Sequence, residues 1–206
     1  MPPRTARDRI ANTTAIRVTD PVRLLKADRD HARNAGDPWA DLCVVASISP
    51  SGEPRSRVLV LRDLDDQLAL FFNASSPKSE EFKRSESLSI LLYLHALKVQ
   101  YRLTATFAEV DPNVIAQSWK LRPLVPRKLD WLYATRPQSS SVPSREALLD
   151  AIDRIPETTT APPTARGYAL VPTEIERLDL DQPNGIHDRR RYKRLGDNWH
   201  ETVLIP

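Results

Sequence analysis

The chain has 206 residues, of which 40% are hydrophobic and 28% are charged, so it can bury a core of its own. No apolar run approaches the roughly 20 residues of a membrane-spanning helix, and the N-terminal sequence lacks the apolar stretch of a secretory signal. The single cysteine, Cys43, cannot form an internal disulfide, and no Cys or His pair has the spacing of zinc ligands. We therefore expect a cytoplasmic protein with no membrane partner and no metal site.

The charges nearly balance, because 30 basic and 27 acidic residues give a formal net charge of +3. Such a charge suits an anionic small ligand as well as a polyanion, so it does not decide between them. The chain has only 5 glycines and contains neither the GxGxxG nor the GxxxxGKS/T pattern of a phosphate-binding loop. Side chains would therefore have to do much of the work of holding a phosphate.

In chain order, residues 1–19 read as a polar arm, and a helix follows. Asp20 is a favoured N-cap, Pro21 suits the first helical turn, and Gly36 is a typical helix stop. The Pro/Thr-rich segment 157–166 reads as a loop within one sheet, because the strands after it are too few to form a second domain. We predict that residues 20–206 form a single domain.

Short strand signals separated by turns dominate that domain. Residues 99–110 alternate most clearly between apolar and polar side chains. We predict strands over 41–49, 54–64, 67–75, 89–96, 99–110, 167–180, 186–194 and 199–206. We predict helices over 77–85, 111–123, 127–135 and 144–155. This pattern favours a mainly β (α+β) fold, with a small antiparallel barrel and peripheral helices.

Arg57 lies in the middle of the predicted strand 54–64, on the same face as Leu59 and Leu61. Burying an unpaired charge is costly, so Arg57 either reaches water at a sheet edge or meets an anionic partner. Arg62 falls on the opposite face of the strand. The two arginines can serve one ligand only if the strand twists or bulges between them.

Two polar loops offer further phosphate ligands. Residues 75–79 (SSPKS) combine hydroxyls and Lys78 with a helix start, whose free N–H groups attract anions. Residues 138–141 (QSSS) add an amide and more hydroxyls. Each loop has a simpler interpretation: a serine helix cap for the first and a solvated loop for the second.

The chain closes with a basic segment, IHDRRRYKR, at residues 186–194. In an alternating strand His187 and Arg189 would point the same way, and with Asp188 they suit acid–base chemistry or anion binding. The remaining basic residues fit a solvated strand face. We do not expect a nucleic-acid partner, because Tyr192 is the only aromatic residue in the segment and nearby acids interrupt its positive field.

The order of these segments is more specific than any one of them. From about Asp20 to Pro206 they resemble the pyridoxamine 5′-phosphate oxidase family and its FMN-binding split-barrel relatives. The resemblance implies a Greek-key split β-barrel, a homodimer, and FMN bound in clefts at the dimer interface. The segments that carry it are DPVRLLKADRDHARNAGDP, SPSGEPRSRVLVLR, LFFNASSPKSEEF, VQYRL, LRPLVPRKLDWLYATRPQSS and IHDRRRYKR, with the W and LIP that follow.

The resemblance also implies which side chains hold the cofactor. At the phosphate end these would be Arg57 and Lys78, while Arg62 would reach the flavin ring or the substrate. A dianionic phosphate attracts several such charge-assisted donors.

Four further residues would contact the rest of the cofactor. Gln100 and Arg189 match flavin contacts, and an arginine stabilises the negative charge of reduced flavin. Gln138 and Ser139 match a Q-S-S segment that reaches FMN from the partner subunit.

The departures from the family pattern fall mostly on the substrate side. Gly185 stands where the family has an arginine, and Ser118 and Pro126 stand where a tyrosine and a serine hold the substrate phosphate. Arg122 and His187 are retained as substrate contacts. The segment IERLDL also lacks the tryptophan that the family has there.

We therefore expect a divergent relative of the oxidase: an FMN-binding oxidoreductase that transfers hydride from a small-molecule substrate to flavin N5. We assign no catalytic residue, because positioning beside the flavin supplies much of the catalysis. Two alternatives stay open, a non-catalytic flavin-binding or flavin-sensing protein and a basic nucleic-acid-binding barrel. The sequence names neither the substrate nor the electron acceptor.

Overall fold

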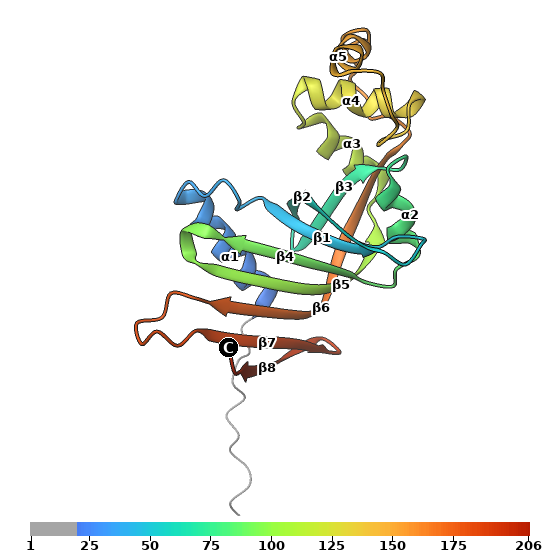
Figure 1. Ribbon diagram of the computed structural model, residues 1–206. Helices are drawn as coiled ribbons and strands as arrows, with labels where there is room; N and C mark the ends of the chain where they lie inside the picture. Colours follow the sequence, from blue (N-terminus) through green and yellow to red (C-terminus); the bar gives the residue numbers. More distant parts are fainter. Residues whose placement is uncertain (1–19) are drawn as a thin grey trace, which may run out of the picture.

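The computed structural model describes residues 20–206, so the predicted arm 1–19 lies outside the described residues. The chain forms a strand-rich barrel with a lobe of helices at one end (Figure 1). The strands are β1 (Leu42–Ile48), β2 (Pro54–Leu64), β3 (Gln67–Asn73), β4 (Leu88–Leu94), β5 (Val99–Glu109), β6 (Ala165–Asp179), β7 (Asp188–Leu195) and β8 (Asn198–Leu204). The α-helices are α1 (Pro21–Asn34), α2 (Pro77–Lys83), α3 (Pro112–Lys120), α4 (Leu124–Thr135) and α5 (Arg145–Asp153). A short 3-10 helix, η1, spans His95–Leu97.

The strands pair antiparallel in the order β3-β2-β1-β4-β5-β6-β7-β8, and β3 also pairs with β6. This extra pairing closes β1 to β6 into a ring, and the spatial order β4-β1-β2-β3 is that of a Greek key. The long strand β6 divides its pairing, because its first half pairs with β3 and its second half with β7. The predicted antiparallel Greek-key split barrel is confirmed.

The alternation of β5 builds the barrel interior. Val99, Tyr101, Leu103 and Ala105 are buried in the core, while Phe107 packs at its edge and stacks on Tyr168. The intervening polar residues point away from this core, as the period of two requires.

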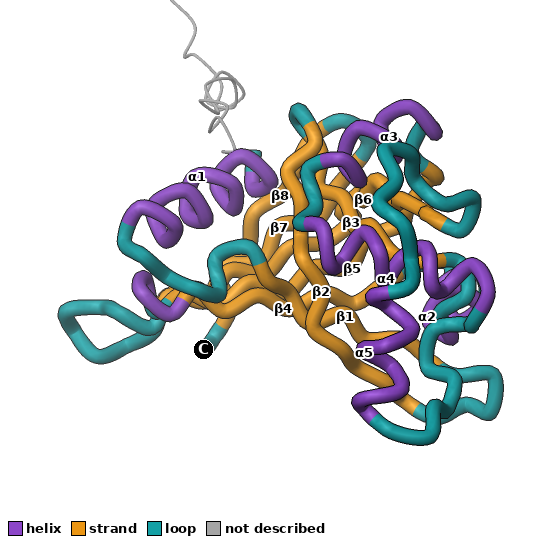
Figure 2. Tube along the Cα trace, turned by 90° about the horizontal axis from the view of Figure 1, so that it is seen from above, coloured by secondary structure: helices purple, strands orange, loops and turns teal. Residues whose placement is uncertain are grey.

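Helix α1 packs against the barrel on the side away from α3, α4 and α5 (Figure 2). It begins where predicted, since the Asp20 carboxylate accepts a hydrogen bond from the Val22 N–H at 2.9 Å. Gly36, just beyond its end, has a φ of +75°, which favours glycine. The Tyr101 hydroxyl donates to Asp28 at 2.6 Å, so α1 is tied to β5 by a buried hydrogen bond.

Within residues 20–206, no helix combines the length and the apolar character that crossing a membrane requires. The same residues contain no group of three or more His, Cys, Asp or Glu placed to hold a metal ion.

Candidate functional site

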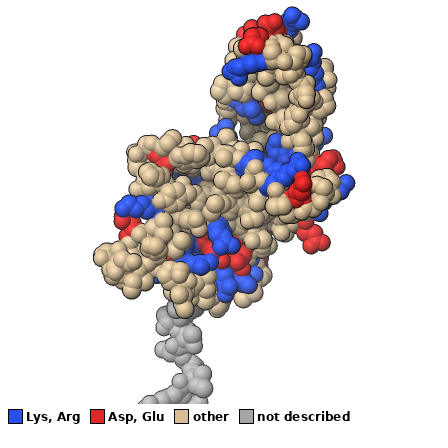
Figure 3. Space-filling view, in the orientation of Figure 1, with Lys and Arg blue, Asp and Glu red and all other residues tan. Residues whose placement is uncertain are grey.

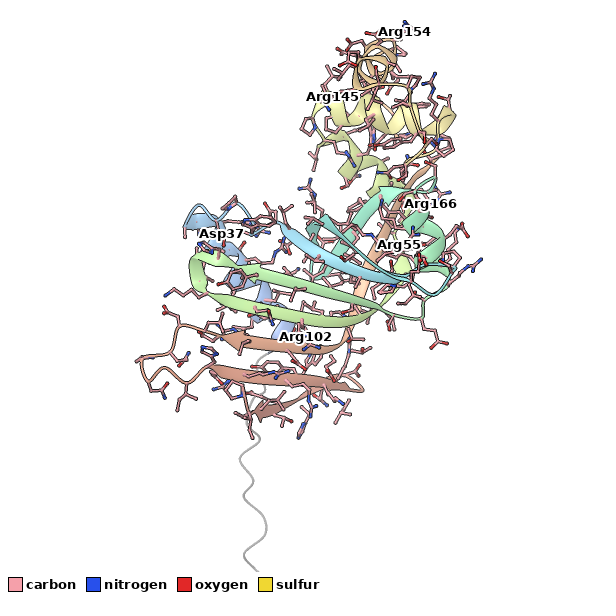
Figure 4. All side chains as sticks on the ribbon, in the orientation of Figure 1. Asp37, Arg55, Arg102, Arg145, Arg154 and Arg166 are labelled. Carbon is pink, nitrogen blue, oxygen red and sulfur yellow. The ribbon has the colours of Figure 1, made fainter. Side chains whose placement is uncertain are left out.

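A cleft of about 390 Å³ is formed by β2, β3, α2, the segment from α3 to α4, and the start of β6. Four of the residues selected from the sequence line it: Arg62, Lys78, Arg122 and Gln138. Basic side chains gather at the base of the helical lobe (Figure 3), and Arg166, another lining residue, lies near this junction (Figure 4). The cleft therefore collects cations from segments far apart in the chain.

A larger hollow of about 660 Å³ lies between the start of α1, β6 and the β7–β8 hairpin. Among residues 20–206, Asp20, Asp66 and Asp197 line it together with one cation, Arg194. None of the cofactor or substrate residues proposed from the sequence lines this hollow, so its size does not make it the better candidate.

The two polar loops meet at one side of the smaller cleft. The Asn73 side-chain oxygen accepts from the N–H and hydroxyl of Ser75 at 2.9 and 2.8 Å, and the Gln138 N–H donates to that hydroxyl at 3.1 Å. Lys78 Nζ donates to the Ser76 hydroxyl at 2.6 Å and to Gln138 Oε1 at 3.3 Å. Ser76 is the N-cap residue of α2, but its side chain caps no N–H, so the simple-cap interpretation is wrong.

This arrangement places Gln138 beside Lys78 of its own chain, so no partner subunit is needed to bring the two together. Ser139 is exposed in the turn that follows, with a φ of +75°.

Arg57 does not line the cleft. It lies on the inner face of β2, opposite the buried Val45, and its guanidinium donates to Glu81 and to Ser47, each at 2.5 Å. The Glu81 side chain on α2 is 1% exposed, so Arg57 has a buried anionic partner rather than water. Arg62 is on the outer face and does line the cleft, as alternation predicts.

The electrostatics of Lys78 suit an anion. Burial lowers the pKa of this ammonium, and the nearby Arg57 lowers it further, while Glu81 opposes the shift. An arriving phosphate would relieve both effects, because it would neutralise a cation that is partly removed from water. The side chains of Lys78 and Gln138, both in the cleft lining, thus fit the phosphate of FMN.

Gln100 and Arg189 lie elsewhere, on the outer face of the sheet. The pairings Tyr93–Gln100, Gln100–Leu178 and Leu178–Arg189 put these residues in one cross-strand row. The Arg189 guanidinium donates to Glu176 at 2.8 Å.

His187 departs from the sequence-based prediction. It is exposed and precedes β7, which begins at Asp188. His187 therefore lies one residue outside the strand in which alternation would align it with Arg189.

Two of the four other cations of β7, Arg190 and Lys193, are paired with acids among the described residues. Arg190 contacts Asp188 at 2.8 Å and Glu201 at 2.6 Å, and Lys193 lies 3.4 Å from Glu174. This compensation fits a solvated strand face and gives no support to a nucleic-acid surface.

Asp130 on α4 is a cleft residue that the sequence did not reveal. It is buried, it accepts from the Trp119 indole N–H at 2.9 Å, and it lies 3.3 Å from Arg122 Nε. Burial raises its pKa, although Arg122 and Trp119 oppose the shift. Nothing in RKLDWLYAT marks this aspartate as buried, because its partners come from α3 and the following turn.

Comparisons with known proteins agree on the fold and the family. No family model matches the chain. It is 31% identical over 191 residues to a pyridoxine/pyridoxamine 5′-phosphate oxidase of Polynucleobacter asymbioticus, which covers 90% of this chain and 89% of that protein. It is 30% identical over 194 residues to pyridoxine/pyridoxamine 5′-phosphate oxidase 1 of Ralstonia nicotianae, with 91% and 89% covered.

Two solved structures are similar along nearly the whole chain. The first is PhzG from Burkholderia lata in complex with tetrahydrophenazine-1-carboxylic acid, with a TM-score of 0.79, 25% identity, and 90% and 92% of the two chains covered. The second is a pyridoxamine 5′-phosphate oxidase-related, FMN-binding protein from Nostoc punctiforme, with a TM-score of 0.76, 20% identity, and 92% and 99% covered. Because the second structure is only 20% identical in sequence, its similarity supports the fold alone.

Proposed function

Because the chain belongs to the pyridoxine/pyridoxamine 5′-phosphate oxidase family, we propose that it is an FMN-dependent oxidoreductase acting on a small molecule. The observation that carries the proposal is the cleft in which Arg62, Lys78, Arg122 and Gln138 converge. These residues were selected from three separate segments of the sequence, and the fold brings them to the lining of one cavity.

The residues divide into a cofactor part and a substrate part. Lys78 and Gln138 would hold the FMN phosphate, with Arg57 adding positive charge from behind. Arg62 would lie at the flavin or the substrate, and Arg122 at the substrate. FMN, when bound, supplies a ring that accepts hydride from a substrate carbon.

We also propose that a second copy of the chain completes the site. Trp39, Val58, Leu91 and Tyr93 are between 37% and 52% exposed on the outer face, and they line a common hollow. A patch of this kind on a soluble protein marks an interaction surface.

The patch is positioned to join the two groups of cofactor residues. Val58 also lines the cleft, and Tyr93 pairs directly with Gln100. Burying the patch against a second copy would bring the partner's Gln100 and Arg189 toward this chain's cleft. The proposed unit is therefore a homodimer with FMN at the interface.

Lys78→Ala tests the cofactor assignment. The change removes a cation from the phosphate subsite, so FMN should bind about 1–3 kcal/mol more weakly, the usual worth of a charge-assisted hydrogen bond. Riboflavin, which lacks the phosphate, should lose much less. Fluorescence titration of the apoprotein with each flavin measures both affinities.

Lys83→Ala is the matched control, because Lys83 is exposed on the same helix and pairs with Glu80. It should change neither affinity. Equal losses for FMN and riboflavin in Lys78→Ala would contradict the phosphate assignment, and a wild-type protein that binds no flavin would overturn the proposed function.

A further inference from the structure

We propose that the cleft takes an unphosphorylated aromatic substrate, and that Asp130 sets this preference by neutralising Arg122. The inference rests on the proposed function, since it names the substrate class of the same cleft. It concerns a residue to which the sequence analysis gave no role.

The first step is the Asp130–Arg122 ion pair. Arg122 is a cleft cation in the turn between α3 and α4, and its Nε lies 3.3 Å from Asp130 Oδ2. The Asp130 side chain is only 11% exposed, whereas the Arg122 side chain is 35% exposed, so the carboxylate is shielded from water while the guanidinium still reaches it. A phosphate monoester would have to compete with a carboxylate already in place.

The second step is that Asp130 is held firmly. The Trp119 indole donates to the same oxygen at 2.9 Å, and Trp119 is itself buried. Helix α4 carries Asp130, and α3 carries Trp119, so the carboxylate is fixed from two elements. It cannot swing away from Arg122 without losing a buried hydrogen bond.

The third step is the chemistry of the surrounding lining. The first turn of α4 contains Pro126, which offers no N–H, and its N-cap residue Pro123 makes no side-chain cap. Both prolines line the cleft, together with Phe71, Ile115, Leu129 and Tyr133. These side chains favour a flat apolar ring over a doubly charged group.

Asp130 is also the only acidic side chain in the lining of this cleft, as residues 20–206 form it. Its negative charge therefore acts on the substrate without an acidic neighbour sharing the effect. At Arg122, a ligand group with no charge avoids the repulsion from Asp130 that a phosphate would meet, while Arg62 stays available for a single negative charge elsewhere on the ligand.

The test compares pyridoxal with pyridoxal 5′-phosphate on the FMN-loaded protein by calorimetry. Wild type should bind pyridoxal at least as tightly as pyridoxal 5′-phosphate. Asp130→Asn keeps the shape and releases Arg122, so the ratio should shift about tenfold toward the phosphorylated ligand, the effect of about 1.4 kcal/mol. The double variant Arg122→Gln/Asp130→Asn should return the ratio to the wild-type value.

Asp150→Asn on the exposed face of α5 is the charge-matched control and should leave the ratio unchanged. A wild-type protein that prefers pyridoxal 5′-phosphate over pyridoxal would overturn the proposal, whether or not the variants fold. So would an unchanged ratio in a folded Asp130→Asn protein. Calorimetry measures binding of the two test ligands independently of flavin absorbance. A protein that cannot be loaded with FMN would contradict the proposed function, which is a different outcome from a changed ligand preference.

Discussion

The pair between Arg57 and Glu81 shows how one residue serves both the fold and the site. Glu81 holds Arg57 at 2.5 Å and is bonded by Ser47 at the same distance. The Arg57 guanidinium also lies 5.9 Å from the centre of the Phe82 ring. These contacts hold the Arg57 guanidinium behind Lys78. The Glu81 carboxylate also offsets part of the positive charge of Arg57.

Glu81→Gln should therefore act in opposite directions on stability and on cofactor binding. The loss of a charge-assisted bond should lower the free energy of unfolding by about 1–3 kcal/mol, which chemical denaturation of the apoprotein measures. The released positive charge should strengthen FMN binding while leaving riboflavin almost unchanged. A variant that loses affinity for both flavins would show that Glu81 only holds the fold.

At the scale of elements, the strands and helices could be predicted because their signals are local. The alternation of 99–110 and the Asp20-Pro21 helix start are both found as predicted. The pairing of β3 with β6 places Asn73 opposite Ala165, although the segment between them in the sequence includes the whole helical lobe. No local sequence pattern specifies such a distant pairing. The burial of Asp130 has the same origin, because it depends on how α3 and α4 pack.

The close approach of β6 to α3 depends on one glycine. A Cβ at Gly167 would lie 2.7 Å from Phe71 Cε1 and 3.3 Å from Ile115 Cγ1. Phe71 and Ile115 both line the cleft, so overpacking at this position disturbs the site as well as the strand pair.

Gly167→Ala should lower the free energy of unfolding by about 1–3 kcal/mol, the usual cost of overpacking, and should weaken FMN binding. Thermal denaturation and flavin titration measure the two effects. Adding Phe71→Leu should recover part of the stability, because it removes the ring that the new methyl meets. No recovery in the double variant would place the strain elsewhere.

At the scale of the molecule, the candidate residues form two groups that one chain does not unite. Arg62, Lys78, Arg122 and Gln138 share the cleft, whereas Gln100 and Arg189 lie in a row across β5, β6 and β7. The sequence could identify the residue types in both groups. It could not show this separation, which follows from the register of the strands.

Leu91→Asp tests whether a second copy joins the two groups. Leu91 is 37% exposed in the apolar patch, it does not line the cleft, and its cross-strand neighbour Arg102 can pair with the new carboxylate. The fold should therefore survive while the dimer weakens, because an aspartate in a buried interface is costly. Sedimentation velocity should show a larger monomer fraction.

FMN affinity should fall together with the dimer, because Gln100 and Arg189 of the second copy would be lost from the site. Leu149→Asp, at a position 46% exposed on α5, is the matched control and should change neither quantity. If wild type is a monomer that binds FMN tightly, the cleft of one chain is sufficient and the shared site is wrong. If Leu91→Asp separates the copies but keeps full FMN affinity, the dimer exists without contributing to the cofactor site.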